Sequence, residues 1–454
     1  MSADRSHVIL IGAGLAGTLL AVSLARRGFR VDLYERRPDM RSARISAGRS
    51  INLALSVRGI HALEEVGLAD DILSIAIPMH SRCIHPHAGA PFFVPYGQDE
   101  SQHINSVSRG ELNKRLLSCA EGFPDVTIHF ETRCIGMDLD SGEVHLRDER
   151  DGREFTARAD TVIGTDGSAS ALRGAMLQRG RFNYAQQYLE HGYKELHIPA
   201  GADGAFQLER HALHIWPRMS YMLIGLPNLD GSFTLTLFFP FEGDPSFSSL
   251  ATPAQAWAFF DDQFADALAL MPTFDEDFAH NPASALVTVR CAPWHVEGRV
   301  ALLGDAAHAI VPFFGQGMNA SFEDCSALAA CIDEHGADWS RVFSDYEQRR
   351  RRNADAIADL AIENFVEMRD LTADPHFLLK RAAGLELERR FPDMFIPKYS
   401  MVSFTRIPYA DAQARGRVQD RILEQLCADR TRIDDVDWDL AYTLVTTTLS
   451  PIAL

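Results

Sequence analysis

The sequence predicts an α/β chain, α+β overall, in which a doubly wound parallel sheet is interrupted by a second, mostly antiparallel sheet and followed by a helical C-terminal region. Residues 7–14 form a short apolar run typical of a strand buried on both faces, and helical spacing follows at once over 14–28. Residues 30–37 return to a strand pattern, which completes a β-α-β unit. Aromatic and β-branched segments separated by turn residues fill 181–284 and indicate the second sheet.

Length and composition exclude several classes of protein. A chain of 454 residues is too long for one small core, so two or three structural units are expected. Hydrophobic residues make up 46% and charged residues 23%, as in ordinary globular proteins. The formal net charge of −18 argues against nucleic acid as a partner, because neutralising phosphates requires a basic surface.

The order of the patterns predicts that the first unit is discontinuous, with the second sheet inserted into it. Residues 345–371 are expected to form a long helix whose four consecutive arginines, 349–352, form a solvated face. The expected boundaries are 1–75, 102–180 and 285–370 for the first unit, 76–101 and 181–284 for the inserted substrate-binding sheet, and 371–454 for the helical region.

Cysteine spacing and hydropathy indicate the compartment. The seven cysteines include no C-x-x-C pair, so neither a zinc site nor a redox dithiol is indicated, and we expect no metal. Residues 9–25 are uncharged but carry glycines at fixed offsets and lack a small-residue cleavage site, which argues against a signal peptide. No other stretch approaches the ~20 apolar residues of a membrane span. We therefore expect a cytoplasmic protein without a membrane anchor, either a monomer or a homodimer.

The first turn carries the pattern G-A-G-L-A-G, formed by Gly12, Gly14 and Gly17. Gly12 permits a tight turn, Gly14 lets the backbone approach a pyrophosphate, and Gly17 allows close packing of helix on strand. The helix N-terminus supplies free N–H groups for the phosphates. Glu35 ends the second strand, where a carboxylate accepts hydrogen bonds from ribose hydroxyls. The pattern predicts a Rossmann-like domain for a dinucleotide without a 2′-phosphate, either NAD or FAD.

Two further strand ends favour FAD over NAD. In residues 161–173 a strand is followed by a turn at Asp166. In residues 299–319 a strand ends at Asp305, whose carboxylate can accept a hydrogen bond from a ribityl hydroxyl.

A loop and a helix start follow Asp305. The loop Pro312–Gly317 keeps the backbone close to a planar ring, and the next helix begins near Met318 and Asn319. A helix N-terminus placed there would stabilise the negative charge of a reduced flavin. His308, between two alanines and an apolar run, is interpreted as a structural residue.

These motifs together resemble the FAD-dependent aromatic hydroxylases, the single-component flavin monooxygenases. Longer strings extend the resemblance over most of the chain, among them S-V-S-R-G-E-L-N, L-H-I-W-P-R and P-K-Y-S-M-V-S-F-T-R-I-P-Y. The resemblance implies tightly bound FAD, NADPH and O₂ as co-substrates, and oxygen transfer to an aromatic ring through a flavin C4a-hydroperoxide. The sequence has no second G-x-G-x-x-G for the nicotinamide, so the residues alone leave NADPH and NADH open.

The resemblance also implies an aromatic amino acid substrate, an ortho-aminophenyl ketone whose amino group already activates the ring. Arg82 can bind its carboxylate with two hydrogen bonds, and Tyr96 can donate another. No acid or base is required from the protein, and the loop residues Pro312, Phe313, Gly315 and Gln316 would position the ring. The residues implied to bind substrate are Arg82, Tyr96, Phe238, Phe313, Asn364, Met368 and Tyr399. Those implied to contact FAD are Gly12, Gly14, Gly17, Glu35, Arg36, Ala54, Arg109, Asp166, Asp305, Gly317, Met318 and Asn319.

The chain departs from the family pattern at two points. Phe314 stands where some relatives have a polar residue, which puts the response of the loop to substrate in doubt. The C-terminal membrane helix of the eukaryotic members is missing. Two alternatives stay open: hydroxylation of another aromatic acid, such as a hydroxybenzoate or salicylate, and a flavin electron carrier without oxygen transfer. The polar set around Arg82 favours an amino acid tail, and an enclosed aromatic sheet argues against a carrier.

Overall fold

A computed structural model describes residues 6–42, 52–371 and 374–452, and it confirms the predicted fold class. The chain divides into two compact units, each built from separate stretches of sequence. Unit 1 comprises 1–75, 107–188 and 287–358, and unit 2 comprises 76–106, 189–286 and 359–454. The helical C-terminal segment therefore belongs to the same unit as the inserted sheet.

Unit 1 is organised around a six-stranded sheet in the order β18-β19-β12-β1-β2-β8. All neighbours are parallel except β18, which runs antiparallel to β19. Residues 8–10 of β1 are completely buried, as a strand covered by helices on both faces requires. The strands are β1 (His7–Ile11), β2 (Arg30–Tyr34), β8 (Val126–His129), β12 (Thr161–Gly164), β18 (His295–Val296) and β19 (Val300–Leu302).

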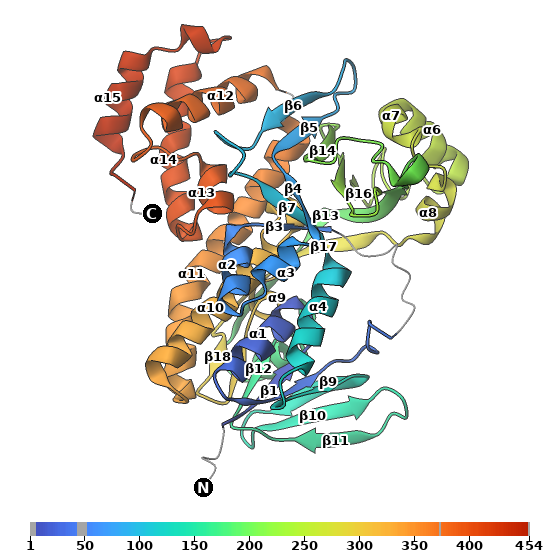
Figure 1. The fold of residues 1–454 in the computed structure, drawn as a ribbon, viewed down its shortest axis with the longest axis vertical. Helices are drawn as coiled ribbons and strands as arrows, with labels where there is room; N and C mark the ends of the chain where they lie inside the picture. The colour runs from blue at the N-terminus through green and yellow to red at the C-terminus, as the bar shows by residue number, and fades with distance from the viewer. Residues whose placement is uncertain (1–5, 43–51, 372–373, 453–454) are drawn as a thin grey trace. The chain divides into compact units, whose positions relative to one another are not determined.

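Helices pack against this sheet and against one another. In unit 1, α1 (Leu15–Arg26) contacts both α4 (Arg109–Glu121) and α10 (Gly317–His335), and α10 also packs on α2 (Val57–Glu65). The start of α4 is set by Ser108, whose hydroxyl accepts a hydrogen bond from the N–H of Glu111. A separate three-stranded sheet lies within the same unit (Figure 1) and consists of β9 (Thr132–Asp138), β10 (Glu143–Asp148) and β11 (Glu154–Ala157).

The main sheet of unit 2 is mostly antiparallel, in the order β17-β13-β16-β15-β14-β5-β6, and its one parallel pair is β14 with β5. Alternate residues of β16, from Phe233 to Phe239, face a core shared with three helices, α6 (Pro253–Gln263), α7 (Ala265–Leu268) and α8 (Phe274–His280). The strands are β5 (Ser81–Ile84), β6 (Phe92–Pro95), β13 (Asn183–Ile198), β14 (Ala212–Pro217), β15 (Met222–Pro227), β16 (Phe233–Pro240) and β17 (Ser284–Ala292).

A second apolar core in unit 2 is formed by C-terminal helices. Its buried residues include Leu379, Leu387, Ile422, Leu426 and Val445. The helices are α12 (Pro375–Arg390), α14 (Tyr409–Cys427) and α15 (Trp438–Thr448), and the short helix α13 (Lys398–Phe404) packs against α14. Within the described residues, every helix is too short or too polar to cross a membrane.

Candidate functional site

The turn between β1 and α1 requires glycine at two positions and leaves space at a third. A Cβ added to Gly12, which has φ +101°, would lie 2.6 Å from the carbonyl oxygen of Thr165. A Cβ on Gly17 would lie 2.0 Å from the carbonyl oxygen of Gly12. A Cβ on Gly14 would meet nothing within 4 Å. The turn therefore packs tightly behind the glycines and leaves an open approach to the N-terminus of α1, which suits a pyrophosphate.

Glu35, at the end of β2, is hydrogen-bonded to this turn. Its Oε2 accepts the Ala13 N–H at 3.0 Å, and its Oε1 accepts the backbone N–H and Nε–H of Arg37, both at 2.9 Å. A carboxylate has about four lone-pair positions, so Glu35 can still accept bonds from ribose hydroxyls. Arg36, expected to contact FAD, is exposed, and its neighbour Arg37 forms the ion pair.

The two acids at the strand ends occupy different settings. The Oδ2 of Asp166 accepts the N–H of Ala171 at 2.7 Å, while its Oδ1 is buried and has no hydrogen-bond partner in the described part of the chain. Burial raises the pKa of Asp166. Asp305 begins a single helical turn, α9 (Asp305–His308), directly after β19, and its side chain is exposed. The charge of Arg109, another expected FAD contact, acts on the Asp305 carboxylate.

The loop after α9 is fixed by the side chain of Asn319. Its Oδ1 accepts the Ser56 N–H at 2.9 Å, and its Nδ2 donates to the carbonyl oxygens of Ala54 and Gly315 at 2.8 and 2.9 Å. Gly315 adopts φ +67° and follows the 3₁₀ turn Pro312–Phe314, of which Phe313 and Phe314 are buried. Because the Asn319 side chain is used in this way, only its backbone N–H in the first turn of α10 is left for the contact with FAD that the sequence predicts.

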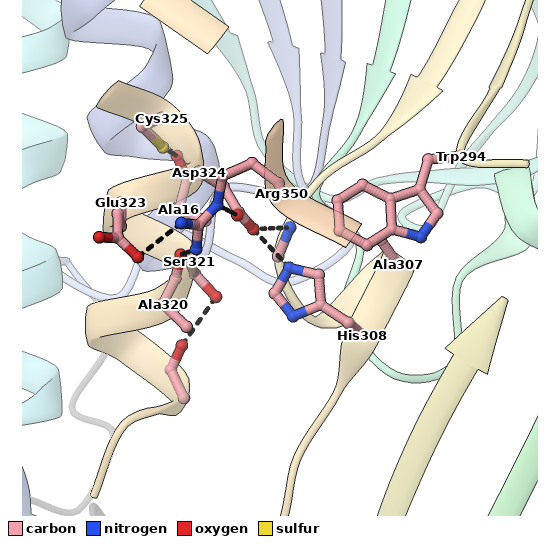
Figure 2. Close-up of polar contacts among 12 residues, drawn as sticks. Ala16, Trp294, Ala307, His308, Ala320, Ser321, Glu323, Asp324, Cys325 and Arg350 are labelled. Atoms are coloured by element: carbon pink, nitrogen blue, oxygen red, sulfur yellow. Dashed lines mark hydrogen bonds and ion pairs between the residues drawn. The ribbon is translucent and has the colours of Figure 1, made fainter. Parts of the chain in front are cut away.

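Asp324 is the centre of a network of charged residues that includes His308, Arg350 and Glu323 (Figure 2). Asp324 accepts hydrogen bonds from Gly304 N at 3.2 Å, His308 Nε2 at 2.5 Å and Arg350 Nε at 2.7 Å. Arg350 also donates to Glu323 at 2.6 Å. Burial disfavours a charged imidazole, but Asp324 outweighs this and raises the pKa of His308.

This network corrects one expectation. The prediction that arginines 349–352 form a solvated face is wrong for Arg350, which is only 5% exposed. Arg350 lies one helical turn after the buried Tyr346 and so shares its inward face of α11 (Trp339–Val366).

Unit 2 brings together three of the residues expected to bind the substrate carboxylate. The guanidinium carbon of Arg82 lies 5.4 Å from the ring centroid of Tyr96 and 4.7 Å from that of Tyr399. The two rings are stacked, with centroids 5.5 Å apart. Arg82 Nε is buried and has no hydrogen-bond partner among the described residues, and the Tyr96 hydroxyl, which is also buried, interacts with Arg82 and Tyr399. Burial raises the pKa of Tyr96, so its hydroxyl is a donor at neutral pH.

Arg381, on α12, is a member of this cluster that sequence reasoning missed. Its Nη2 donates to the Pro95 carbonyl at 2.7 Å, and its Nε is buried without a partner in the described chain. Burial and the neighbouring charge of Arg82 lower the pKa of Arg381 to about 10. No sequence signal marks it, because an arginine on an amphipathic helix usually faces solvent. Two adjacent cations with buried, unsatisfied N–H groups give this cluster the chemistry that suits an anion.

The remaining expected substrate residues are buried. Phe238 in β16, Asn364 in α11 and Met368 in the π-helical turn Glu367–Leu371 belong to unit 2. Phe313 is the one expected substrate residue in unit 1. Every residue expected to contact FAD lies in unit 1.

The chain is similar to known proteins over nearly its whole length. The model of a family described as "FAD binding domain" matches residues 5–189 and 271–361. A kynurenine 3-monooxygenase from Myxococcus xanthus (strain DK1622) is 52% identical over 449 residues, which cover 99% of this chain and 97% of that protein. A kynurenine 3-monooxygenase from Dictyostelium discoideum is 45% identical, with 96% and 97% covered.

Solved structures show the same fold at low identity. A 2-methyl-3-hydroxypyridine-5-carboxylic acid oxygenase superposes with a TM-score of 0.66 at 20% identity, covering 84% of this chain and 96% of that one. A probable FAD-dependent monooxygenase from Pseudomonas aeruginosa gives a TM-score of 0.64 at 21% identity, covering 81% and 97%.

Proposed function

Because the chain belongs to the kynurenine 3-monooxygenase family of FAD-dependent enzymes, we propose that it converts L-kynurenine to 3-hydroxy-L-kynurenine with NADPH and O₂. The observation in the structure that carries this proposal is the anion site of unit 2. Arg82 Nε is a buried donor without a partner in the described chain, with the Tyr96 ring beside it, and an α-amino acid carboxylate would satisfy this donor.

The residues of unit 1 fit FAD. The open space at Gly14 and the helix start behind it suit the pyrophosphate, and Glu35 suits the ribose. The unsatisfied Oδ1 of Asp166 can accept a hydroxyl or N–H from a ligand. When bound, FAD supplies the electron transfer and the oxygen transfer. Unit 1 is therefore proposed as the FAD-binding domain, and the sheet of unit 2 as the main part of the substrate-binding domain.

The protein residues bind and orient the substrate. Arg82 would hold the carboxylate with two parallel N–H···O bonds, and Tyr96 would donate a third bond. Phe238 and Phe313 are proposed as apolar contacts for the ring. The amino group of kynurenine already donates electrons to the ring, so the site needs no protein base for ring activation. Its requirements are orientation and exclusion of water, which buried aromatic side chains provide.

The test is anaerobic reduction of the FAD-loaded enzyme by NADPH, with and without kynurenine, followed by product analysis in air. We expect kynurenine to accelerate reduction and to be hydroxylated at C3. Hydroxybenzoate and salicylate, run in parallel, test the nearest alternative substrates. A protein that reduces its flavin equally fast with all compounds and transfers no oxygen would be an electron carrier, and the proposal would be wrong.

We also propose that the enzyme works in the cytoplasm as a monomer or homodimer. All seven cysteines are free thiols, as is usual in a reducing compartment. Light scattering coupled to size-exclusion chromatography distinguishes a 50.4 kDa monomer from a dimer.

A further inference from the structure

Three potential metal ligands meet on the sheet of unit 2, outside the anion site. Side chains alternate along a strand, so Cys83 and His85 face the same side at β5, opposite to Arg82. His214 is the direct partner of Cys83 on the neighbouring strand β14. The ligand atoms of Cys83, His85 and His214 all lie within 4.8 Å of one another, and all three residues are buried.

The outer nitrogen of each histidine is held by an acceptor. His214 Nε2 donates to the carbonyl oxygen of Glu209 at 2.9 Å, and His85 Nδ1 donates to Asp266 Oδ2 at 2.7 Å. Both carboxylate oxygens of Asp266 also accept the indole N–H of Trp216, at 2.9 and 3.0 Å, as suits an ionised carboxylate. A carbonyl and an ionised carboxylate only accept, so both outer nitrogens carry their protons.

This proton count leaves two lone pairs facing each other. His85 Nε2 and His214 Nδ1 are 2.9 Å apart, and a neutral imidazole has no second N–H to place there. A cation must therefore bind at this point, either an extra proton or a metal ion.

The donor set matches zinc. One thiolate and two neutral imidazoles are common zinc ligands, and histidine ligands usually donate their other N–H to a carboxylate or a backbone carbonyl, as His85 and His214 do. Two Zn–N bonds of about 2.0 Å at the tetrahedral angle place the nitrogens about 3.3 Å apart, so the pair would need to open only slightly. Asp266 has a half-exposed side chain, which brings solvent, and thus a route for the ion, to the edge of the cluster.

We propose that Cys83, His85 and His214 bind one zinc ion, with water as the fourth ligand, and that this ion ties β5 to β14. Because Arg82 precedes Cys83 on β5, the ion would also stiffen the strand that carries the anion site. The absence of a C-x-x-C pair gave no hint of it, since one ligand lies 129 residues from His85 in the sequence. The proposal does not depend on which substrate the enzyme hydroxylates.

The test uses the full-length protein loaded with FAD and stripped of metal with a chelator. Zinc is titrated against a chromophoric competitor, and cobalt is titrated separately. We expect one zinc per chain, and a cobalt derivative with tetrahedral d–d bands and a thiolate-to-cobalt charge-transfer band. Zinc binding at neutral pH should release about two protons, one from the Cys83 thiol and one from the histidine pair. Burial raises the pKa of that thiol to about 11, so it is protonated before metal binds.

Two variants assign the ligands. Cys83→Ser should remove the charge-transfer band and weaken zinc binding at least about tenfold. Cys119→Ser, a partly buried thiol on α4, is the matched control and should bind zinc like the wild type. If Cys83→Ser fails to fold, the cobalt spectrum and the proton release of the wild-type protein still test the proposal. Binding weaker than about 10 μM, a cobalt spectrum without a thiolate band, or equal losses in both variants would overturn the proposal; in the first case only a proton would lie between the histidines.

Discussion

Replacing Arg82 with methionine separates a binding role from a structural one. Arg82 is 5% exposed, its Nε has no partner in the described chain, and its guanidinium lies over the rings of Tyr96 and Tyr399 and also interacts with their hydroxyls. Methionine fills a similar volume and removes a buried charge that the free protein does not neutralise at Nε. The free enzyme should therefore lose little stability, less than about 1 kcal/mol, or gain some.

The cost should appear in substrate binding. A hydrogen bond to a charged group contributes about 1.5–3 kcal/mol, so two such bonds at the lower value give about 3 kcal/mol. At about 1.4 kcal/mol per factor of ten, the apparent Kd for kynurenine should rise by about 100-fold.

The assay is the dependence of the anaerobic FAD reduction rate on kynurenine concentration, together with thermal melting of the substrate-free enzyme. Arg218→Met is the matched control, because Arg218 is also partly buried in unit 2 but donates to the carbonyl oxygens of Gln263 and His85. It should lower the melting temperature and leave the apparent Kd near the wild-type value. The reasoning fails if Arg82→Met changes the Kd by less than about threefold, or if it destabilises the free enzyme by more than about 3 kcal/mol, the range for a broken structural ion pair.

Three further predictions use other parts of the molecule. Gly17→Ala should unfold the turn and yield protein without FAD, because its Cβ would lie 2.0 Å from Gly12 O, whereas Gly14→Ala should fold and only weaken FAD binding; the FAD-to-protein ratio and melting temperature measure both. Arg381→Met should raise the apparent Kd for kynurenine by about tenfold, since it removes about one charge-assisted bond, and an unchanged Kd would exclude it from the anion site. The raised pKa of His308 means that its ion pair with Asp324 stabilises fully below about pH 6.5 and is lost as pH rises through the folded-state pKa. His308→Gln should therefore flatten the fall in melting temperature between about pH 6.5 and 9, and an unaltered slope would refute this.

The parts of the structure that depend on local pattern could be predicted from sequence. The strand-turn-helix at residues 7–28 and the acids at strand ends follow from apolar periodicity and turn glycines within about 20 residues. Arg350 could not be placed in this way, because four consecutive arginines conceal which one faces inward. The answer depends on Asp324 and Glu323, which belong to another helix.

Contacts between residues that lie far apart in the sequence could not be predicted either. The assignment of Asn319 to FAD did not foresee that its side chain would bind the backbone at Ala54 and Ser56. Arg381 meets Arg82 only because α12 and β5 belong to one unit. Such contacts depend on the path that the chain takes in the fold, whereas a sequence pattern shows only the order of residue types.

The buried polar groups that lack partners give one physical criterion for the sites. A folded chain satisfies nearly all its buried donors and acceptors, because leaving one unmade costs about 1–3 kcal/mol. Arg82 Nε and Arg381 Nε are donors on cationic groups and therefore suit an anion, while Asp166 Oδ1 is an acceptor and suits a donor from a ligand. The histidine pair at His214 differs, since its facing lone pairs require a cation. The two faces of β5 therefore suit ligands of opposite charge. For this reason, Arg82→Met and Cys83→Ser should have separate effects, although the two residues are adjacent in the sequence.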